Sequence, residues 1–275
     1  MYRVAPARLA TTTRTGGLIE LPLRLADVRY RRFTEPRSRV GGPAITRYFA
    51  DLTSAFDVPG MPAGQWQADG TTYAEMAAAM LTDLGAPDVD LVVLATAAPD
   101  LDPWRSAATY ANHALCERPL LFAVTEQGPA ATYTALRLAG DLAGRHGLAN
   151  VLVLAMDQAT LPYPVPPGEL SGDAAVALVL GRGSGELFVG QRANVSTIEL
   201  SGAVDALVPE LAAPWVVAGP KVGALPGRLP VSDRAPAGLP CTAGWAVARR
   251  PAVWVDHDPA AGDLSVCVAV EEVNR

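Results

Sequence analysis

The sequence is constrained most by a regular alternation of apolar runs with helical patterns between residues 73 and 181. Four runs are almost purely aliphatic or β-branched, which is typical of strands covered on both faces. These runs are residues 90–97, 119–125, 150–156 and 174–181. The segments between them space apolar residues three or four apart and predict helices. Strands that alternate with helices in this way predict βαβ crossovers and a largely parallel sheet, so the fold class is α/β.

The helices of this region have readable limits. The first begins near residue 73, places Ala77, Met80 and Leu84 on one face, and ends near Gly85. Two more are predicted at about 103–116 and 129–144. Residues 1–70 are less regular, with scattered glycine and proline, and predict only a strand at 18–25. Arginines recur there at positions 24, 29, 31, 32, 37 and 39.

The pattern changes after residue 181. Short strand-like runs follow, and at most two helices, at about 203–212 and 242–249. The runs are residues 186–190, 195–200, 215–219, 252–256 and 264–273. Gly262 and Asp263 predict the turn of a final hairpin. The sequence shows neither a repeat nor a linker, so we expect residues 1–275 to form a single unit.

Composition excludes several classes of function. The net charge of −6 gives no overall basic field, so a nucleic-acid partner is not expected. The three cysteines form no CxxC pair, which fits neither a disulfide framework nor a zinc site and suggests a reducing, cytoplasmic location. No apolar stretch approaches the length that spans a bilayer, so no membrane association is expected.

The strand at 119–125 runs directly into a turn, residues 126–129, here called the elbow. Residues 122–130 read Phe-Ala-Val-Thr-Glu-Gln-Gly-Pro-Ala, and a Gly-Asp-Ala-Ala segment follows at 172–175. This order resembles the N-terminal half of the thiolase-fold condensing enzymes, closest to the ketoacyl synthase III branch. The resemblance implies a layered α-β-α-β-α fold. Residues 1–181 would form its N-terminal half, and 182–275 a C-terminal half shortened relative to the family.

The elbow lacks the residue on which that family depends. In the family a cysteine occupies this turn, where the positive end of the following helix favours the thiolate. The matching positions here are Glu126, Gln127 and Gly128. None of them can accept an acyl group, so we expect no catalytic residue at the elbow. The Val-Thr-Glu-Gln sequence is similar to the elbow of chain length factors, the cysteine-free partner subunits of polyketide ketosynthases. An ordinary polar residue at a helix start is the alternative interpretation of Gln127.

The histidines do not match the family's second set of catalytic groups. Active members stabilise the thioester enolate with a histidine and an asparagine or second histidine. We expect His113 on a helix, His146 at a helix end, and His257 in a hairpin loop, each in a structural role. Asp256 and Asp258 flank His257, but so close a trio indicates a turn rather than a metal site. No metal and no bound cofactor are expected.

The resemblance to chain length factors implies a non-catalytic subunit that pairs with an active ketosynthase and shapes its acyl tunnel in polyketide or fatty-acyl synthesis. Dimers of the family form through the strand before the elbow, here 119–125. Substrates would arrive as phosphopantetheine thioesters on an acyl carrier protein. The arginines between 24 and 39 could receive that carrier protein, or they could be a solvated surface or a subunit contact.

Two enzymatic alternatives stay open. One is a malonyl-thioester decarboxylase, because enolate stabilisation needs no covalent capture, although it needs the missing histidines. The other is a thiolase-fold acyltransferase or hydrolase with relocated catalytic residues. Its candidate is Cys241, at the start of a predicted helix that would lower the pKa of the thiol. A small buried hydrophobic role for Cys241 is the competing interpretation.

Overall fold

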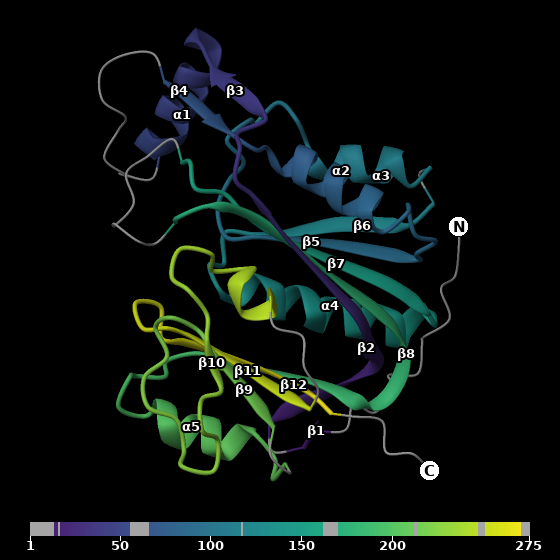
Figure 1. Ribbon diagram of the computed structural model, residues 1–275, viewed down its shortest axis with the longest axis vertical. Helices are drawn as coiled ribbons and strands as arrows, with labels where there is room; N and C mark the ends of the chain where they lie inside the picture. Colours follow the sequence, from purple (N-terminus) through teal and green to yellow (C-terminus); the bar gives the residue numbers. More distant parts are fainter. Residues whose placement is uncertain are drawn as a thin grey trace, which may run out of the picture.

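The chain forms five layers, α-β-α-β-α, in a computed structural model (Figure 1). The structure describes residues 14–15, 17–55, 66–116, 118–161, 170–211, 214–246 and 251–270. Two sheets enclose a central helix, and further helices cover their outer faces. From one outer layer to the other, the helices are α2 (Tyr73–Asp83) with α3 (Ala107–Ala114), then α4 (Ala130–His146), then α5 (Leu200–Leu207). The expected layered fold is therefore confirmed.

The first sheet has the strand order β6-β5-β7-β8-β2. Its strands are β2 (Leu18–Phe33), β5 (Leu91–Thr96), β6 (Leu120–Thr125), β7 (Asn150–Asp157) and β8 (Asp173–Arg192). β5 pairs in parallel with β6 and β7, whereas β8 is antiparallel to both β7 and β2. The alternation predicted for this region is confirmed, but the sheet is mixed rather than largely parallel, because β8 runs antiparallel to both of its neighbours.

The second sheet repeats this arrangement. Its strands are β9 (Trp215–Ala218), β10 (Asp233–Arg234), β11 (Ala252–Asp258) and β12 (Asp263–Ala269). The order is β10-β9-β11-β12-β8, with β9 parallel to β10 and β11, and β12 antiparallel to β11 and β8. Strand for strand this is the pattern of the first sheet, and the long β8 belongs to both. The chain is thus a structural repeat that its sequence does not reveal.

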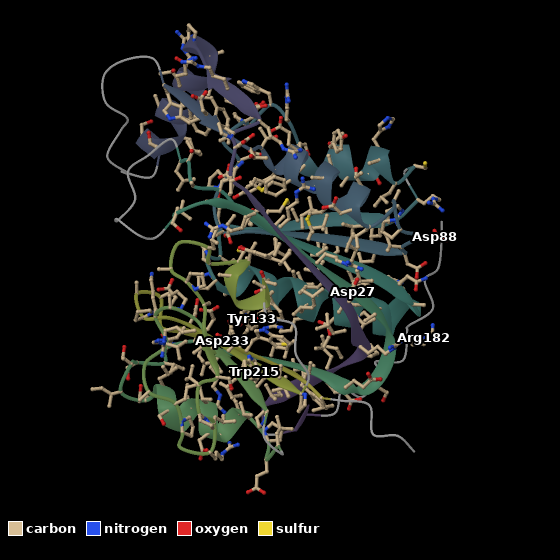
Figure 2. All side chains as sticks on the ribbon, in the orientation of Figure 1. Asp27, Asp88, Tyr133, Arg182, Trp215 and Asp233 are labelled. Atoms are coloured by element: carbon tan, nitrogen blue, oxygen red, sulfur yellow. The ribbon has the colours of Figure 1, made fainter. Side chains whose placement is uncertain are left out.

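Three apolar clusters correspond to the layers. The central cluster packs α4 between the sheets, where Tyr133, labelled in Figure 2, lies against Trp245 and Trp245 stacks on Trp254, with ring centroids 5.4 and 4.9 Å apart. A second cluster joins α2 and α3 to the outer face of the first sheet. The third joins α5 to the outer face of the second sheet. Because strands in the middle of each sheet are covered on both sides, they read as continuous apolar runs.

The N-terminal region holds more structure than its sequence predicts. β2 continues to Phe33, eight residues beyond the predicted strand, and pairs with β8 along most of its length. Exposed arginines interrupt its apolar pattern because β2 lies at the edge of the first sheet, where charged side chains are tolerated. Three further elements went unpredicted: β3 (Ser38–Gly41), α1 (Pro43–Ala55) and β4 (Gln67–Gly70).

Several predictions for the second half are wrong in detail. Residues 195–200 form no strand, because Ser196 and Glu199 exchange hydrogen bonds, with Ser196 Oγ donating to Glu199 Oε2 at 2.6 Å, and α5 then begins at Leu200. The run at 186–190 is part of β8. The predicted helix at 242–249 is a 3₁₀ turn, η1 (Ala243–Ala246), and its last three residues lie outside the described ones. The described helices of the second half, α5 and η1, are thus shorter than α2 and α4 of the first.

The final hairpin is as predicted. Asp258 pairs with Asp263 across the turn, and Gly262 takes a φ of 71°, a left-handed conformation that glycine adopts without strain. β12 ends at Ala269, and residues 271–273 of the predicted strand lie outside the described residues. Among the helices that the structure describes, none is long and apolar enough to cross a membrane.

Candidate functional site

The elbow is a tight turn between the end of β6 at Thr125 and the start of α4 at Ala130. Glu126 and Gly128 both have positive φ, 61° and 51°, and the conformation at Glu126 is strained for a residue with a side chain. The backbone N–H of Glu126 donates to Thr96 O at 3.0 Å, which ties the turn to the end of β5. The shape expected of a strand-to-helix elbow is present although its nucleophile is not.

Glu126 and Gln127 face a polar groove on the outer side of the elbow. The groove has a volume of about 530 Å³, and Arg137, Gln191 and Asp263 also line it. Thr134 Oγ1 donates to Gln127 Oε1 at 2.8 Å, so the side chain turns back along α4. The polar groups of this groove are engaged with one another, since Arg137 also donates to Gln191 Oε1 at 2.8 Å.

A second cavity lies on the inner side of the elbow, at the carboxyl ends of β5 and β11. This elbow cavity has a volume of about 390 Å³, and its lining includes Ala98, Gly128, Pro129, Pro240, Asp256 and Asp258. Gly128 and Asp258 line the outer groove as well, so the elbow separates the two hollows. Of the three predicted elbow positions, Gly128 is therefore the one that reaches the inner cavity. Such apolar cavities with a few polar groups are typical of small-molecule sites.

Buried polar groups fix the loop that follows β5 and leads into this cavity. Gln158 Nε2 donates to Thr71 O at 2.8 Å and to Asp100 Oδ1 at 3.0 Å, while Gln158 Oε1 accepts from Leu101 N at 3.0 Å. Burial raises the pKa of Asp100 to about 6, against the opposing effect of its hydrogen bonds. Asp173, of the Gly-Asp-Ala-Ala segment, accepts from Thr71 N and Ala159 N. Its role in this structure is to hold loops together.

Cys241 lies beside the elbow, but not as a reactive thiolate. Its fully buried Sγ donates to Gly128 O at 3.3 Å. Burial raises the pKa of the thiol well above its ordinary value, and the nearby Asp157 carboxylate raises it further. The expectation of a lowered pKa is wrong first because the thiol is buried, and second because the amides that start the turn donate hydrogen bonds to the Asp157 carboxylate. Cys241 N donates to it at 3.1 Å, and Thr242 donates through its N–H at 2.9 Å and its Oγ1 at 2.7 Å.

Asp157 and Asp256 are two buried carboxyl groups that the sequence did not single out for this site. Burial raises the pKa of Asp157 to about 6 despite the hydrogen bonds from Thr242 and Cys241. Burial raises that of Asp256 to about 8, and the charges of Asp157 and Asp258 add to the effect. The one feature of the sequence that could have identified these two residues is that each acidic residue directly follows an apolar run.

The predicted histidines take different places. His113 and His146 lie on α3 and at the end of α4, exposed, as expected. The loop position expected for His257 is wrong, because it lies within β11 and is buried. Its Nε2 donates to Val195 O at 2.8 Å, since a carbonyl can only accept. Within the described ranges, no three His, Cys, Asp or Glu side chains gather closely enough to hold a metal ion, and this includes Asp256, His257 and Asp258.

Comparisons with known proteins identify the fold. No protein-family model and no curated protein sequence matches the chain. Solved structures do. A 3-oxoacyl-(acyl carrier protein) synthase III from Pseudomonas aeruginosa is 14% identical, with a TM-score of 0.55, over 92% of this chain and 99% of that one. The synthase III from Thermus thermophilus is 13% identical, with a TM-score of 0.57, over 90% and 99%.

A third neighbour is the priming β-ketosynthase of a polyketide biosynthetic pathway. It is 14% identical, with a TM-score of 0.56, over 91% of this chain and 96% of that one. At these identities the similarity shows a shared fold, and it extends over almost the whole length of both chains. The fold is thus the thiolase-like fold of synthase III condensing enzymes.

Proposed function

We propose that this chain, which has the fold of the synthase III condensing enzymes, is a non-catalytic subunit that pairs with an active ketosynthase, as chain length factors do. One observation carries the proposal. The elbow keeps its strained geometry between β6 and α4, yet Glu126, Gln127 and Gly128 offer no group that can accept an acyl chain. A protein that keeps this scaffold without its nucleophile is suited to shape the acyl tunnel of a partner.

The enzymatic alternatives find less support in the site. A relocated nucleophile at Cys241 would need an accessible thiolate, whereas this thiol is fully buried with a raised pKa. A decarboxylase would need histidines that face the elbow cavity. His113 and His146 are exposed on helices. His257 lines the elbow cavity, where its Nε2 is bound to the carbonyl of Val195 and its buried Nδ1 has no hydrogen-bond partner within the described residues. The buried thiol and a single cavity histidine, where the enzymes use a pair of such groups, favour the subunit over an independent enzyme.

The open edge of β6 is the surface that we assign to the partner. Among the described strands, β6 pairs with β5 alone, so its outer edge presents unpaired backbone groups. Leu120 on this strand is 52% exposed, and Tyr110 on the neighbouring α3 is 48% exposed. Large exposed apolar and aromatic side chains beside an open strand favour a protein interface. Pairing there would join the sheets of the two subunits.

The acyl groups in this assembly would be phosphopantetheine thioesters carried by an acyl carrier protein. The exposed Arg24, Arg29 and Arg32 on β2 could receive the phosphate and the acidic surface of that carrier. Arg29 is already paired with Asp27 at 2.7 Å, so it would have to exchange partners. No metal or other cofactor takes part in this proposal.

Native mass spectrometry tests the pairing directly. We expect the chain, coexpressed with a ketosynthase encoded in its own genomic neighbourhood, to form a one-to-one complex. Leu120→Asp should abolish that complex, because a charge would be buried at the joined edges. The matched control is Ile198→Asp, at a side chain that is 95% exposed in the turn before α5. A homodimer that ignores the ketosynthase, or a complex equally sensitive to both substitutions, would contradict the proposal.

A further inference from the structure

Asp157 and Asp256 hold equivalent positions in the structural repeat. The equivalent strands, in chain order, are β2, β5, β6 and β7 in the first half and β8, β9, β10 and β11 in the second, so β7 corresponds to β11. Their last residues paired with the neighbouring parallel strand are Met156, opposite Thr96, and Val255, opposite Ala218. The next residue is Asp157 in one half and Asp256 in the other. Side chains alternate along a strand, so both carboxyl groups share the face of Ala155 and Trp254, which pack in the central layer.

The two carboxyl groups meet different partners because the facing turns differ. Asp157 faces the start of η1, where Cys241 and Thr242 supply hydrogen-bond donors. The equivalent residues before α4 are Gly128 and Pro129. Pro129 has no N–H and no hydroxyl, so it cannot replace Thr242. The carboxyl group of Asp157 is therefore capped by hydrogen-bond donors, whereas that of Asp256 lines the elbow cavity.

The surroundings of Asp256 favour its neutral form. The carboxyl group fills the space above Gly219, where any side chain would collide with it. The hydrogen bond from the backbone N–H of His257 and the charge of Lys221 favour the ionised form, but burial outweighs them. The charges and titratable groups that act on it or lie around it come from several elements: Asp157, Asp258, Lys221, His257, Tyr133 and Cys241. Burial is the largest cause of its raised pKa of about 8. At pH 7 the group is then a carboxylic acid, able to donate a hydrogen bond.

We propose that the elbow cavity binds the carbonyl group of an uncharged acyl chain, and that the carboxylic acid of Asp256 donates a hydrogen bond to the carbonyl oxygen. The cavity, about 390 Å³ in volume, has a size suited to a small ligand. Ala97, Ala98 and Pro240 provide apolar walls for the chain. The choice of an acyl thioester as the ligand rests on the proposed function. Since the elbow carries no nucleophile, the thioester would be held without reaction.

The test compares two probes that differ in one carbonyl group. S-hexanoyl-N-acetylcysteamine carries a thioester, and S-hexyl-N-acetylcysteamine has a methylene in its place. Binding to the full chain is measured by NMR titration at pH 6.5 and pH 9.5. We expect the thioester to bind about 10-fold more tightly at pH 6.5, the effect of one buried hydrogen bond. The preference should disappear at pH 9.5, because the ionised carboxylate repels the carbonyl oxygen.

Substitutions test whether Asp256 itself causes the preference for the thioester. Asp256→Asn keeps a donor and should keep the preference at both pH values. Asp256→Leu has no donor and should lose it at both. The control Asp263→Asn, on the neighbouring strand and lining the outer groove but not the elbow cavity, should behave as the unmodified chain. Melting temperatures report whether each variant folds. If the leucine variant does not fold, the asparagine variant alone tests the inference, because its preference for the thioester should be the same at both pH values.

Equal binding of the two probes at pH 6.5, or a preference that survives Asp256→Leu, would overturn the inference. These outcomes are independent of the ketosynthase complex, which native mass spectrometry reports. The chain could therefore pair with a ketosynthase and leave the cavity empty, or bind the thioester and pair with nothing.

Discussion

At the scale of single residues, the chemistry of this site depends on which groups can donate hydrogen bonds. Thr242 and the amide of Cys241 bind Asp157, so a buried carboxylate there is compensated. Pro129 stands at the equivalent place beside Asp256 and offers no donor. One difference between two turns thus separates a structural acid from one that lines a cavity. The sequence marks each acid only as a residue that directly follows an apolar run, because its burial and its partners arise from the packing of the two halves.

The raised pKa of Asp256 predicts how stability depends on pH. The folded chain keeps this proton up to about pH 8, whereas the unfolded chain loses it near pH 4. Between these values the folded state binds more protons, so the free energy of unfolding falls as pH rises. Asp256→Asn should remove this loss. Its advantage over the unmodified chain should grow from pH 4 to pH 8, reach at most about 5 kcal/mol, and stay constant above.

Urea denaturation at pH 5, 7 and 9 measures this difference. Asp157 contributes in the same direction, between about pH 4 and 6, in both proteins, and therefore cancels from the comparison. A stability difference that is the same at all three pH values would show that Asp256 does not titrate in the folded state as described.

At the scale of elements, the central helix α4 is positioned by small residues that let it approach the sheets. Gly140 faces β2, and a methyl group added there would lie 2.6 Å from Leu21 Cδ2. Gly144, one turn later, has room, since its added methyl would lie 3.5 Å from Pro22 Cγ. The position of α4 matters for function because its first turn carries the elbow.

These two glycines give a matched pair of substitutions. Gly140→Ala should destabilise the chain by about 1–3 kcal/mol, because the crowded methyl must displace Leu21 or the helix. Gly144→Ala should instead stabilise it by about 0.5–1 kcal/mol, the usual gain of alanine over glycine within a helix. Chemical denaturation of both variants measures the effects, and equal effects of the two substitutions would contradict the close packing at Gly140.

At the scale of the whole molecule, the long strand β8, with β2 paired along it, connects the two halves. β8 pairs with β7 and β2 in the first sheet and with β12 in the second, and α4 packs between the sheets. Neither half can expose its inner face without disrupting the other. The halves of the fold are therefore parts of one cooperative structure.

This connection predicts a single unfolding transition. In differential scanning calorimetry we expect one peak whose calorimetric and van't Hoff enthalpies agree. Gly140→Ala, in the central layer, should move the whole peak to lower temperature. Two resolved peaks, or a shift confined to part of the transition, would show that the halves unfold separately.

The sequence by itself determined the alternating strands and helices of residues 73–181 and the absence of a nucleophile at the elbow. Strands such as 91–96 and 150–157 are buried on both faces, so their apolar runs carry the signal locally, and the elbow residues are read directly from the chain. Only the tertiary structure decided the rest. β2 and the second half are recognised through their pairing with distant strands, and η1 is too short for a periodic pattern. The elbow cavity and its acid exist only because residues about 130 positions apart meet there, and no local pattern encodes such a meeting.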